Sequence, residues 1–142
     1  MSAFSHTVRI ARPPADVFPW LFEEDKVPRW TGSLERYEVP GPLGAGAKVR
    51  QVLTVSGHHL DLELEITGYE PPRAAESRFS TNGIDAVTTY RLAGTGPTEL
   101  TQTLEAKAGS FSARMLLPVV KPRLERKLVE DLERLRDLLG TE

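Results

Sequence analysis

The sequence predicts an α+β protein in which a curved antiparallel sheet of six or seven strands wraps around one long C-terminal helix. Three observations support this fold class. Apolar and polar residues alternate in several short segments, which is the pattern of strands with one buried face. Turns rich in glycine and proline separate these segments. Leucines at helical spacing then run through residues 124–139 near the end of the chain.

The first 30 residues predict one strand followed by two short helices. Every second position from Phe4 to Ile10 falls on one face, which indicates a half-buried strand. Two consecutive prolines end this strand, and apolar residues at helical spacing then predict a helix over residues 14–22. Pro19 lies inside that helix and should shorten or kink it. A second helical turn is expected over residues 25–30, where Pro28 limits its length.

The middle of the chain predicts a run of six further strands. They are expected over residues 34–39, 48–56, 59–67, 75–81, 86–93 and 99–108. Segment 59–67 has the clearest alternation. Its apolar face carries Leu60, Leu62, Leu64 and Ile66, and its polar face carries Asp61, Glu63, Glu65 and Thr67. Turn sequences such as Asn82-Gly83 indicate hairpin connections, so neighbouring strands should be antiparallel.

The C-terminal segment predicts one amphipathic helix. Its apolar seam consists of Leu124, Leu128, Leu132, Leu135 and Leu139. Opposite charges four residues apart, such as Lys127 and Asp131, are expected to pair on its flanks. Pro118 and Pro122 should break or kink the preceding residues, so a straight helix is expected only from near Pro122. Gly140 is a typical helix stop.

Composition restricts the classes of protein to which the chain can belong. Its 142 residues suit one domain over 1–142. The absence of cysteine excludes thiolate catalysis and cysteine-ligated metals. A net charge of −2 disfavours a nucleic-acid partner. The N-terminus lacks the apolar core of a signal peptide, and no segment has the length of a membrane span, so we expect a cytoplasmic protein. It should be a monomer or homodimer.

Several segments together resemble the START-like, helix-grip superfamily, which includes the Bet v 1 allergens and the polyketide cyclase/dehydrase and lipid-transport proteins. The matching segments are Val8-Arg-Ile-Ala-Arg-Pro-Pro-Ala-Asp-Val-Phe18, Trp30, Gly44-Ala-Gly46, Ile66-Thr-Gly-Tyr-Glu-Pro-Pro-Arg73, Tyr90-Arg-Leu92 and Thr98-Glu-Leu-Thr101. The resemblance spans essentially the whole chain and implies a cavity between the sheet and the helix. None of these segments is a catalytic signature, so the resemblance identifies a container and no particular reaction.

The alternation on each strand gives the candidate walls of this cavity. The candidate ligand-binding residues are Trp30, Tyr37, Gln51, Leu62, Leu64, Ser77, Phe79, Thr88, Tyr90, Gln102, Phe111, Met115 and Val119. The last three are expected to form a lid or floor at the start of the C-terminal helix. A mostly apolar pocket with a few polar groups is typical of a small-molecule site. The polar members of the set could instead satisfy each other or bind water in an ordinary core.

Trp30 and Tyr37 are the candidates for the mouth of the cavity. The resemblance implies that cyclases of the superfamily line their pockets with a tryptophan, a tyrosine and an arginine. This chain offers the tryptophan and the tyrosine. It offers no arginine on the apolar face of segment 59–67, which carries only leucines and an isoleucine. Arg50 and Arg114 are conceivable substitutes, although alternation places Arg50 on the outward face. Trp30 could equally be a core residue that closes the end of the sheet.

The remaining constellations predict neither a metal nor an organic cofactor. His58 and His59 are adjacent, so on a strand their side chains point to opposite faces. Asp61, Glu63 and Glu65 share one face, which a solvated sheet surface explains without a cation. The glycine-rich turns lack the lysine of a phosphate loop and the following helix of a dinucleotide site. Ser56 and His58 have no orienting acid, which argues against a hydrolase triad.

Three functions remain open at the level of sequence. The leading hypothesis is a protein that binds a small hydrophobic molecule, such as a lipid, an aromatic compound or a polyketide. The alternative is a cofactor-free cyclase or dehydratase, with Tyr90 or Tyr37 as the acid, since no histidine or carboxylate is expected to point inward. The third is a regulatory protein that resembles the Hsp90 activators of the superfamily.

Overall fold

The computed structural model describes residues 2–55 and 57–140, and the backbone alone at Ser2, Val55 and His58. Its strands are β1 (Ser2–Ile10), β2 (Leu34–Glu38), β3 (Lys48–Val55), β4 (His58–Glu70), β5 (Ala74–Thr81), β6 (Ile84–Ala93) and β7 (Thr98–Ala108). Its helical elements are α1 (Pro14–Val17), the 3₁₀ turns η1 (Phe18–Leu21) and η2 (Val27–Arg29), and the long helix α2 (Phe111–Leu139). The predicted order of elements is therefore confirmed.

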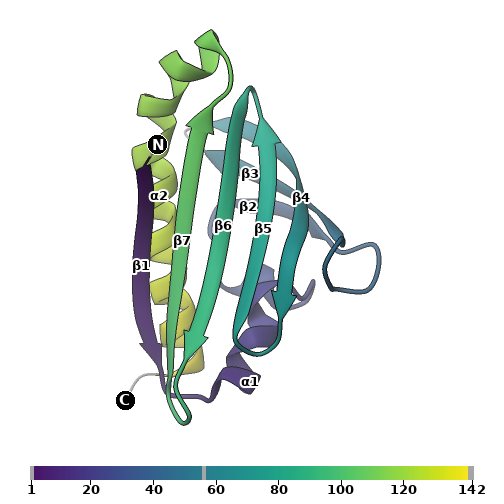
Figure 1. Cartoon of the computed structure of the whole chain (residues 1–142), viewed down its shortest axis with the longest axis vertical. Coiled ribbons are helices and arrows are strands. Elements are labelled where there is room, and N and C mark those ends of the chain that lie inside the picture. The colour runs from purple at the N-terminus through teal and green to yellow at the C-terminus, as the bar shows by residue number, and fades with distance from the viewer. Residues whose placement is uncertain (1, 56, 141–142) are drawn as a thin grey trace.

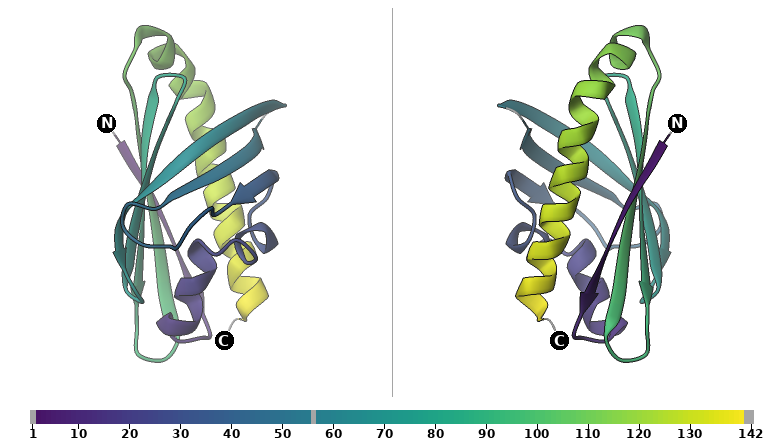
Figure 2. Two further views of the ribbon diagram at one scale, coloured as in Figure 1. Left: turned by 90° about the vertical axis from the view of Figure 1, so that its right-hand side faces the viewer. Right: turned by 90° about the vertical axis from the view of Figure 1, so that its left-hand side faces the viewer.

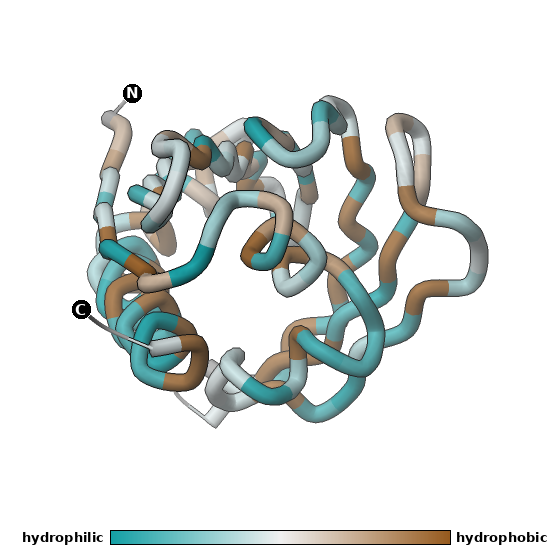
Figure 3. Tube along the Cα trace, turned by 90° about the horizontal axis from the view of Figure 1, so that it is seen from below, coloured by the Kyte–Doolittle hydropathy of each residue, from teal (hydrophilic) through white to brown (hydrophobic). Residues whose placement is uncertain are grey.

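The seven strands form one antiparallel sheet in the order β1-β7-β6-β5-β4-β3-β2. The sheet is strongly twisted, and α2 runs along its concave side (Figures 1 and 2). Viewed from one end, the sheet and its connections curve into a ring with α2 on one side (Figure 3). The predicted α+β fold, a curved sheet around a C-terminal helix, is confirmed.

Alternation predicted the strands well because side-chain direction in a strand depends only on position along the chain. Leu62 and Ile66 are buried while Asp61 and Glu63 are exposed, as expected. The predicted end of β4 at residue 67 was wrong, because the strand continues to Glu70. The register between β4 and β5 shifts between Ile66 and Gly68, and this bulge lets the strand bend and continue.

Pro118 and Pro122 do not break the C-terminal helix, so the predicted break was wrong. Helix α2 begins at Phe111, after the Ser110 Oγ accepts a hydrogen bond from the Ala113 N–H at 3.2 Å. Pro118 and Pro122 lie within it, and both are exposed. Each proline removes one backbone hydrogen bond. Arg114 and Pro118, whose carbonyls lose these bonds, are exposed, so water can replace them.

The leucine seam of α2 packs on the sheet as predicted. Leu132 and Leu135 are fully buried, and Leu128 and Leu139 are nearly so. The helix is also tied to the sheet at both ends. At the C-terminal end, Ala11 N–H donates to the Gly140 carbonyl at 3.0 Å. At the N-terminal end, Gly109 N–H donates to the Gly83 carbonyl at 2.7 Å.

No helix within the described residues is long and apolar enough to cross a membrane.

Candidate functional site

A cavity of about 160 Å³ lies between the concave face of the sheet and the middle of α2. The sheet contributes Tyr37, Gln51, Leu53, Leu60, Leu62, Leu64, Ser77, Phe79, Thr81, Ile84, Thr88, Tyr90, Gln102 and Leu104 to its lining. The segment before the sheet contributes Phe22, Val27, Trp30 and Thr31, and α2 contributes Val120, Leu124, Lys127, Leu128 and Asp131. Most of this surface is apolar, and the polar groups are few.

The structure brings together on this wall every candidate residue that lies on the sheet or in the segment before it. It does not bring Phe111, Met115 and Val119 there. Their exposed fractions are 77%, 67% and 59%, which corrects their predicted place in a lid or floor. The reason is helical phase. Val119 lies nine residues before the buried Leu128, which is half a turn out of phase in an uninterrupted helix.

Trp30 and Tyr37 use their polar atoms to hold the backbone of the preceding segment. Trp30 Nε1 donates to the Trp20 carbonyl at 2.8 Å, and the Tyr37 hydroxyl donates to the Phe22 carbonyl at 2.7 Å. Burial raises the pKa of Tyr37, so its phenol stays protonated. Both side chains line the cavity. They can offer a ligand ring surface, but their donors are already occupied.

Tyr90 is the polar group best placed to meet a ligand. It lies opposite Gln102 in the register of β6 and β7, and Gln102 Nε2 donates to its Oη at 3.3 Å. The hydroxyl proton of Tyr90 has no acceptor among the described residues. Phe22 packs edge-on against the ring at 5.8 Å between centroids. Burial, and secondly the negative charge of Asp131, raise the pKa of Tyr90, so the phenol is a neutral donor.

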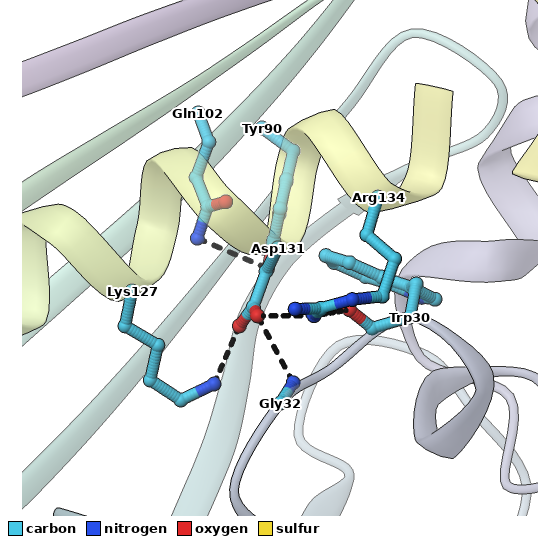
Figure 4. Close-up of polar contacts among 7 residues, drawn as sticks. All are labelled: Trp30, Gly32, Tyr90, Gln102, Lys127, Asp131 and Arg134. Atoms are coloured by element: carbon cyan, nitrogen blue, oxygen red, sulfur yellow. Dashed lines mark hydrogen bonds and ion pairs between the residues drawn. The ribbon is translucent and has the colours of Figure 1, made fainter. Parts of the chain in front are cut away.

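The carboxylate of Asp131 also lines the cavity, and sequence reasoning missed it. Its side chain is only 9% exposed, although it was expected on a flank of the helix. Oδ1 accepts hydrogen bonds from Gly32 N–H at 2.9 Å and Arg134 Nη1 at 3.0 Å, and Oδ2 accepts one from Lys127 Nζ (Figure 4). The expectation that no carboxylate points inward is therefore wrong.

The position of Asp131 could have been found from its spacing along the helix. It lies three residues after Leu128 and four before Leu135, so it is in phase with the buried seam. Its bond to Gly32 joins α2 to the loop after Trp30, and Arg134 Nη1 strengthens the junction by donating to the Trp30 carbonyl at 2.8 Å. The carboxylate thus fixes this part of α2 relative to the loop after Trp30.

The other predicted polar residues keep their hydrogen-bonding capacity. Gln51, Ser77 and Thr88 line the cavity. None of their side chains forms a hydrogen bond with another described residue. Polar atoms in such a wall require either water or ligand atoms as partners. Together with Tyr90 and Asp131 they supply polar groups to a mostly apolar wall.

The convex face of the sheet carries the charged residues that were considered for metal binding. Arg50 donates to both oxygens of Asp61 on this exposed face, so its predicted outward position is confirmed. His59 contacts Glu35 there as well. Within residues 2–55 and 57–140 there is no group of three histidine or carboxylate side chains close enough to hold a metal ion. Ser56 and the side chain of His58 lie outside the described residues.

A twisted antiparallel sheet that grips one long helix around an apolar cavity defines the helix-grip class of proteins. Residues 1–140 match the family described as polyketide cyclase / dehydrase and lipid transport, and the chain belongs to this family. The resemblance noted from the sequence is thereby confirmed. The description of this family names cyclase and dehydrase activity as well as lipid transport. A search of curated proteins found no match.

Solved structures with the same fold come from several bacteria. TTHA0849 from Thermus thermophilus has a TM-score of 0.79 at 16% identity, with 96% of this chain and 95% of that chain covered. The Zhui aromatase/cyclase from Streptomyces sp. R1128 has a TM-score of 0.78 at 18% identity, with 97% and 93% covered. A START superfamily protein from Mycobacterium smegmatis has a TM-score of 0.73 at 13% identity, with 97% and 99% covered. At such identities the likeness is one of fold.

Proposed function

We propose that this protein binds a small, mostly apolar molecule in the cavity and that Tyr90 donates a hydrogen bond to it. One observation carries the proposal: a buried, neutral phenol whose proton has no acceptor in the described chain faces a mostly apolar cavity. A buried donor without a partner is costly, and a ligand acceptor at this point removes that cost. The preferred ligand therefore carries a carbonyl or hydroxyl oxygen beside its apolar part.

The volume of the cavity limits the size of this ligand. A cavity of about 150 Å³ lined by apolar side chains accommodates one benzene molecule, and the cavity here measures about 160 Å³. Pockets for drug-sized ligands are larger, at about 300–1,000 Å³. We therefore infer a ligand with one aromatic ring or an apolar group of similar size. A lipid chain or a multi-ring polyketide would require a wider cavity.

A matched set of ligands tests this proposal. Acetophenone has one ring and a carbonyl acceptor, ethylbenzene lacks the acceptor, and 2-acetylnaphthalene has a second ring. Tryptophan fluorescence can follow each titration because Trp30 lines the cavity. We expect acetophenone to bind more tightly than either of the others. The proposal fails if none of the three binds and mass spectrometry finds no co-purifying apolar molecule.

Two neighbouring threonines provide a variant and its control. Thr88 lines the cavity, and the adjacent Thr89 lies on the opposite face of β6. Thr88→Phe should fill part of the cavity and abolish the binding of acetophenone. Thr89→Phe should leave binding intact, because its ring projects away from the cavity. Equal effects of the two substitutions would contradict the proposed location.

A cofactor-free cyclase or dehydratase is the second candidate, and Asp131 is the observation that favours it. A carboxylate and a neutral phenol that line one cavity could act as base and acid on a bound carbonyl compound. Against this, Asp131 already accepts hydrogen bonds from three donors, which suits a structural role. No arginine lines the cavity among the described residues. Turnover of a poly-β-carbonyl compound that Asp131→Asn abolishes would favour the enzyme.

A further inference from the structure

An exposed apolar stripe runs along the outward face of the first turns of α2. Phe111, Met115 and Val119 form it, at successive spacings of four residues. They are 77%, 67% and 59% exposed, and the adjacent Leu116 is 38% exposed. Only one other large hydrophobic residue in the described chain, Leu138, is comparably exposed. This end of α2 projects beyond most of the sheet (Figures 1 and 2), so the stripe has no partner within the fold.

The charged side chains within the segment that carries the stripe are all basic. Residues 107–124 contain no aspartate or glutamate, although the whole chain has a net charge of −2. Beside the stripe α2 carries the exposed cations Arg114, Arg123 and Arg126, for which no ion pair is present among the described residues. Lys121 differs, because it pairs with Glu125 one turn later. An apolar ridge with basic flanks therefore stands out on an acidic protein.

We propose that this face of α2 docks on the surface of an anionic membrane, with the helix lying in the plane of the interface. Apolar side chains on one face of a helix and basic side chains beside them are the features by which helices bind such surfaces. Phe111, Met115 and Val119 would enter the boundary between headgroups and acyl chains. The arginines would meet the lipid phosphates and carboxylates. The segment lies on the membrane and does not cross it.

The charge pattern favours a lipid surface over a second copy of this chain. A two-fold contact through the stripe would place Arg114 and Arg123 of one copy near the same residues of the other. Their repulsion would oppose the burial of the apolar side chains. An anionic bilayer instead supplies opposite charges on both flanks of the ridge. The inference goes beyond the proposed function, because docking requires no ligand in the cavity.

Sedimentation with vesicles tests the proposal on the intact protein. The probes are vesicles of phosphatidylcholine alone and of phosphatidylcholine mixed with phosphatidylserine. We expect binding to the anionic vesicles only, and weaker binding as the salt concentration rises. Each basic residue near such a surface contributes about 1 kcal/mol. Removal of one arginine should therefore weaken binding about fivefold, and removal of two about 25-fold.

Two pairs of variants separate the apolar and electrostatic contributions. Phe111→Ser with Met115→Ser should abolish binding, whereas Leu138→Ser at the far end of α2 should leave it unchanged. Arg114→Gln with Arg123→Gln should cause the 25-fold loss, whereas Arg9→Gln with Arg91→Gln, on exposed sheet positions, should not. Circular dichroism melts verify that each variant is folded.

Three results would overturn the proposal. The first is equal or absent binding to both kinds of vesicle. The second is binding that the stripe and arginine variants leave unchanged. The third is a dimer, detected by analytical ultracentrifugation, that Phe111→Ser with Met115→Ser dissociates while no vesicle binding occurs. That last result would identify the stripe as an interface between copies of the chain.

Discussion

Replacement of Tyr90 by phenylalanine removes one oxygen atom and leaves the ring in place. In the folded protein that oxygen accepts one hydrogen bond, from Gln102 Nε2 at 3.3 Å. This distance exceeds the usual range of about 2.7–3.2 Å for N–H···O bonds, so the bond is weak. The ring contact with Phe22 is retained. We therefore expect Tyr90→Phe to change the free energy of unfolding by less than about 1 kcal/mol.

The effect on ligand affinity should depend on whether the ligand has an acceptor. A neutral hydrogen bond contributes about 0.5–1.5 kcal/mol to a net binding free energy. Loss of the Tyr90 hydroxyl should therefore weaken acetophenone binding about two- to twelve-fold. Ethylbenzene has no oxygen to accept the bond, and its dissociation constant should stay the same. The difference between the two ligands isolates the hydroxyl from any change in the shape of the cavity.

The assay is a fluorescence titration of both ligands against wild type, Tyr90→Phe and Tyr69→Phe. Tyr69 is a suitable control because its ring packs on Phe18 and is not part of the cavity wall. Equal losses for acetophenone and ethylbenzene, or no loss for either, would refute the anchoring role of Tyr90. A loss of about 10²–10⁴ in turnover of a substrate with unchanged affinity would instead identify the phenol as a catalytic acid.

Three further predictions concern stability. Leu132→Ala should lower the free energy of unfolding by about 2–5 kcal/mol, since Leu132 is 0% exposed. If urea melts show a loss no greater than that of the control Leu138→Ala, the packing of the leucine seam on the sheet is contradicted. Asp131→Ala should lower the free energy of unfolding by about 1–3 kcal/mol, because the Gly32 N–H loses its acceptor and Lys127 its partner. A loss no larger than that of the exposed Asp137→Ala would disprove the stabilising role of the bond between α2 and Gly32. Burial raises the pKa of Tyr37 and Tyr90 in the folded state above the ordinary value of about 10 that applies in the unfolded chain. Their contribution to the free energy of unfolding is therefore complete below about pH 10 and is lost as the pH rises above it. Urea melts at about pH 9 and about pH 11 should show this decline, and if Tyr90→Phe does not make it shallower, the ionisation of Tyr90 is not its cause.

The cavity wall on the sheet could be predicted because it depends on a local rule. Once Leu62 is assigned to the buried face, alternation assigns Leu64 to the same face, and the antiparallel register then aligns Tyr90 with Gln102. No long-range information is required until the strands are joined. The same rule placed Arg50 correctly on the exposed face.

The errors arose where a local rule was overridden by solvent or by tertiary contacts. Proline breaks helices because it removes a hydrogen bond, but at Pro118 and Pro122 the residues whose carbonyls are affected are exposed and the helix continues. That continuity turned Phe111 and its neighbours outward. Asp131 was misplaced for a different reason. Its spacing from Leu128 and Leu135 indicates the buried face, but the expected ion pair with Lys127 assigned it to the flank. Its other partners, the Gly32 N–H and, through Arg134, the Trp30 carbonyl, lie about 100 residues away, where no local pattern shows them.

Besides the packing of its leucine seam, hydrogen bonds near both ends and in its second half fix α2 relative to the sheet. The Gly109–Gly83 bond holds its N-terminal end, the Ala11–Gly140 bond holds its C-terminal end, and Asp131 ties its second half to Gly32. Between Gly109 and Asp131, Val120 and Leu124 line the cavity and face the curved sheet across it. Closure of the cavity would require α2 to move toward β4 and β5 and to break at least one tie. An apolar space already present in the fold favours an apolar ligand, since binding then needs little rearrangement of the fold.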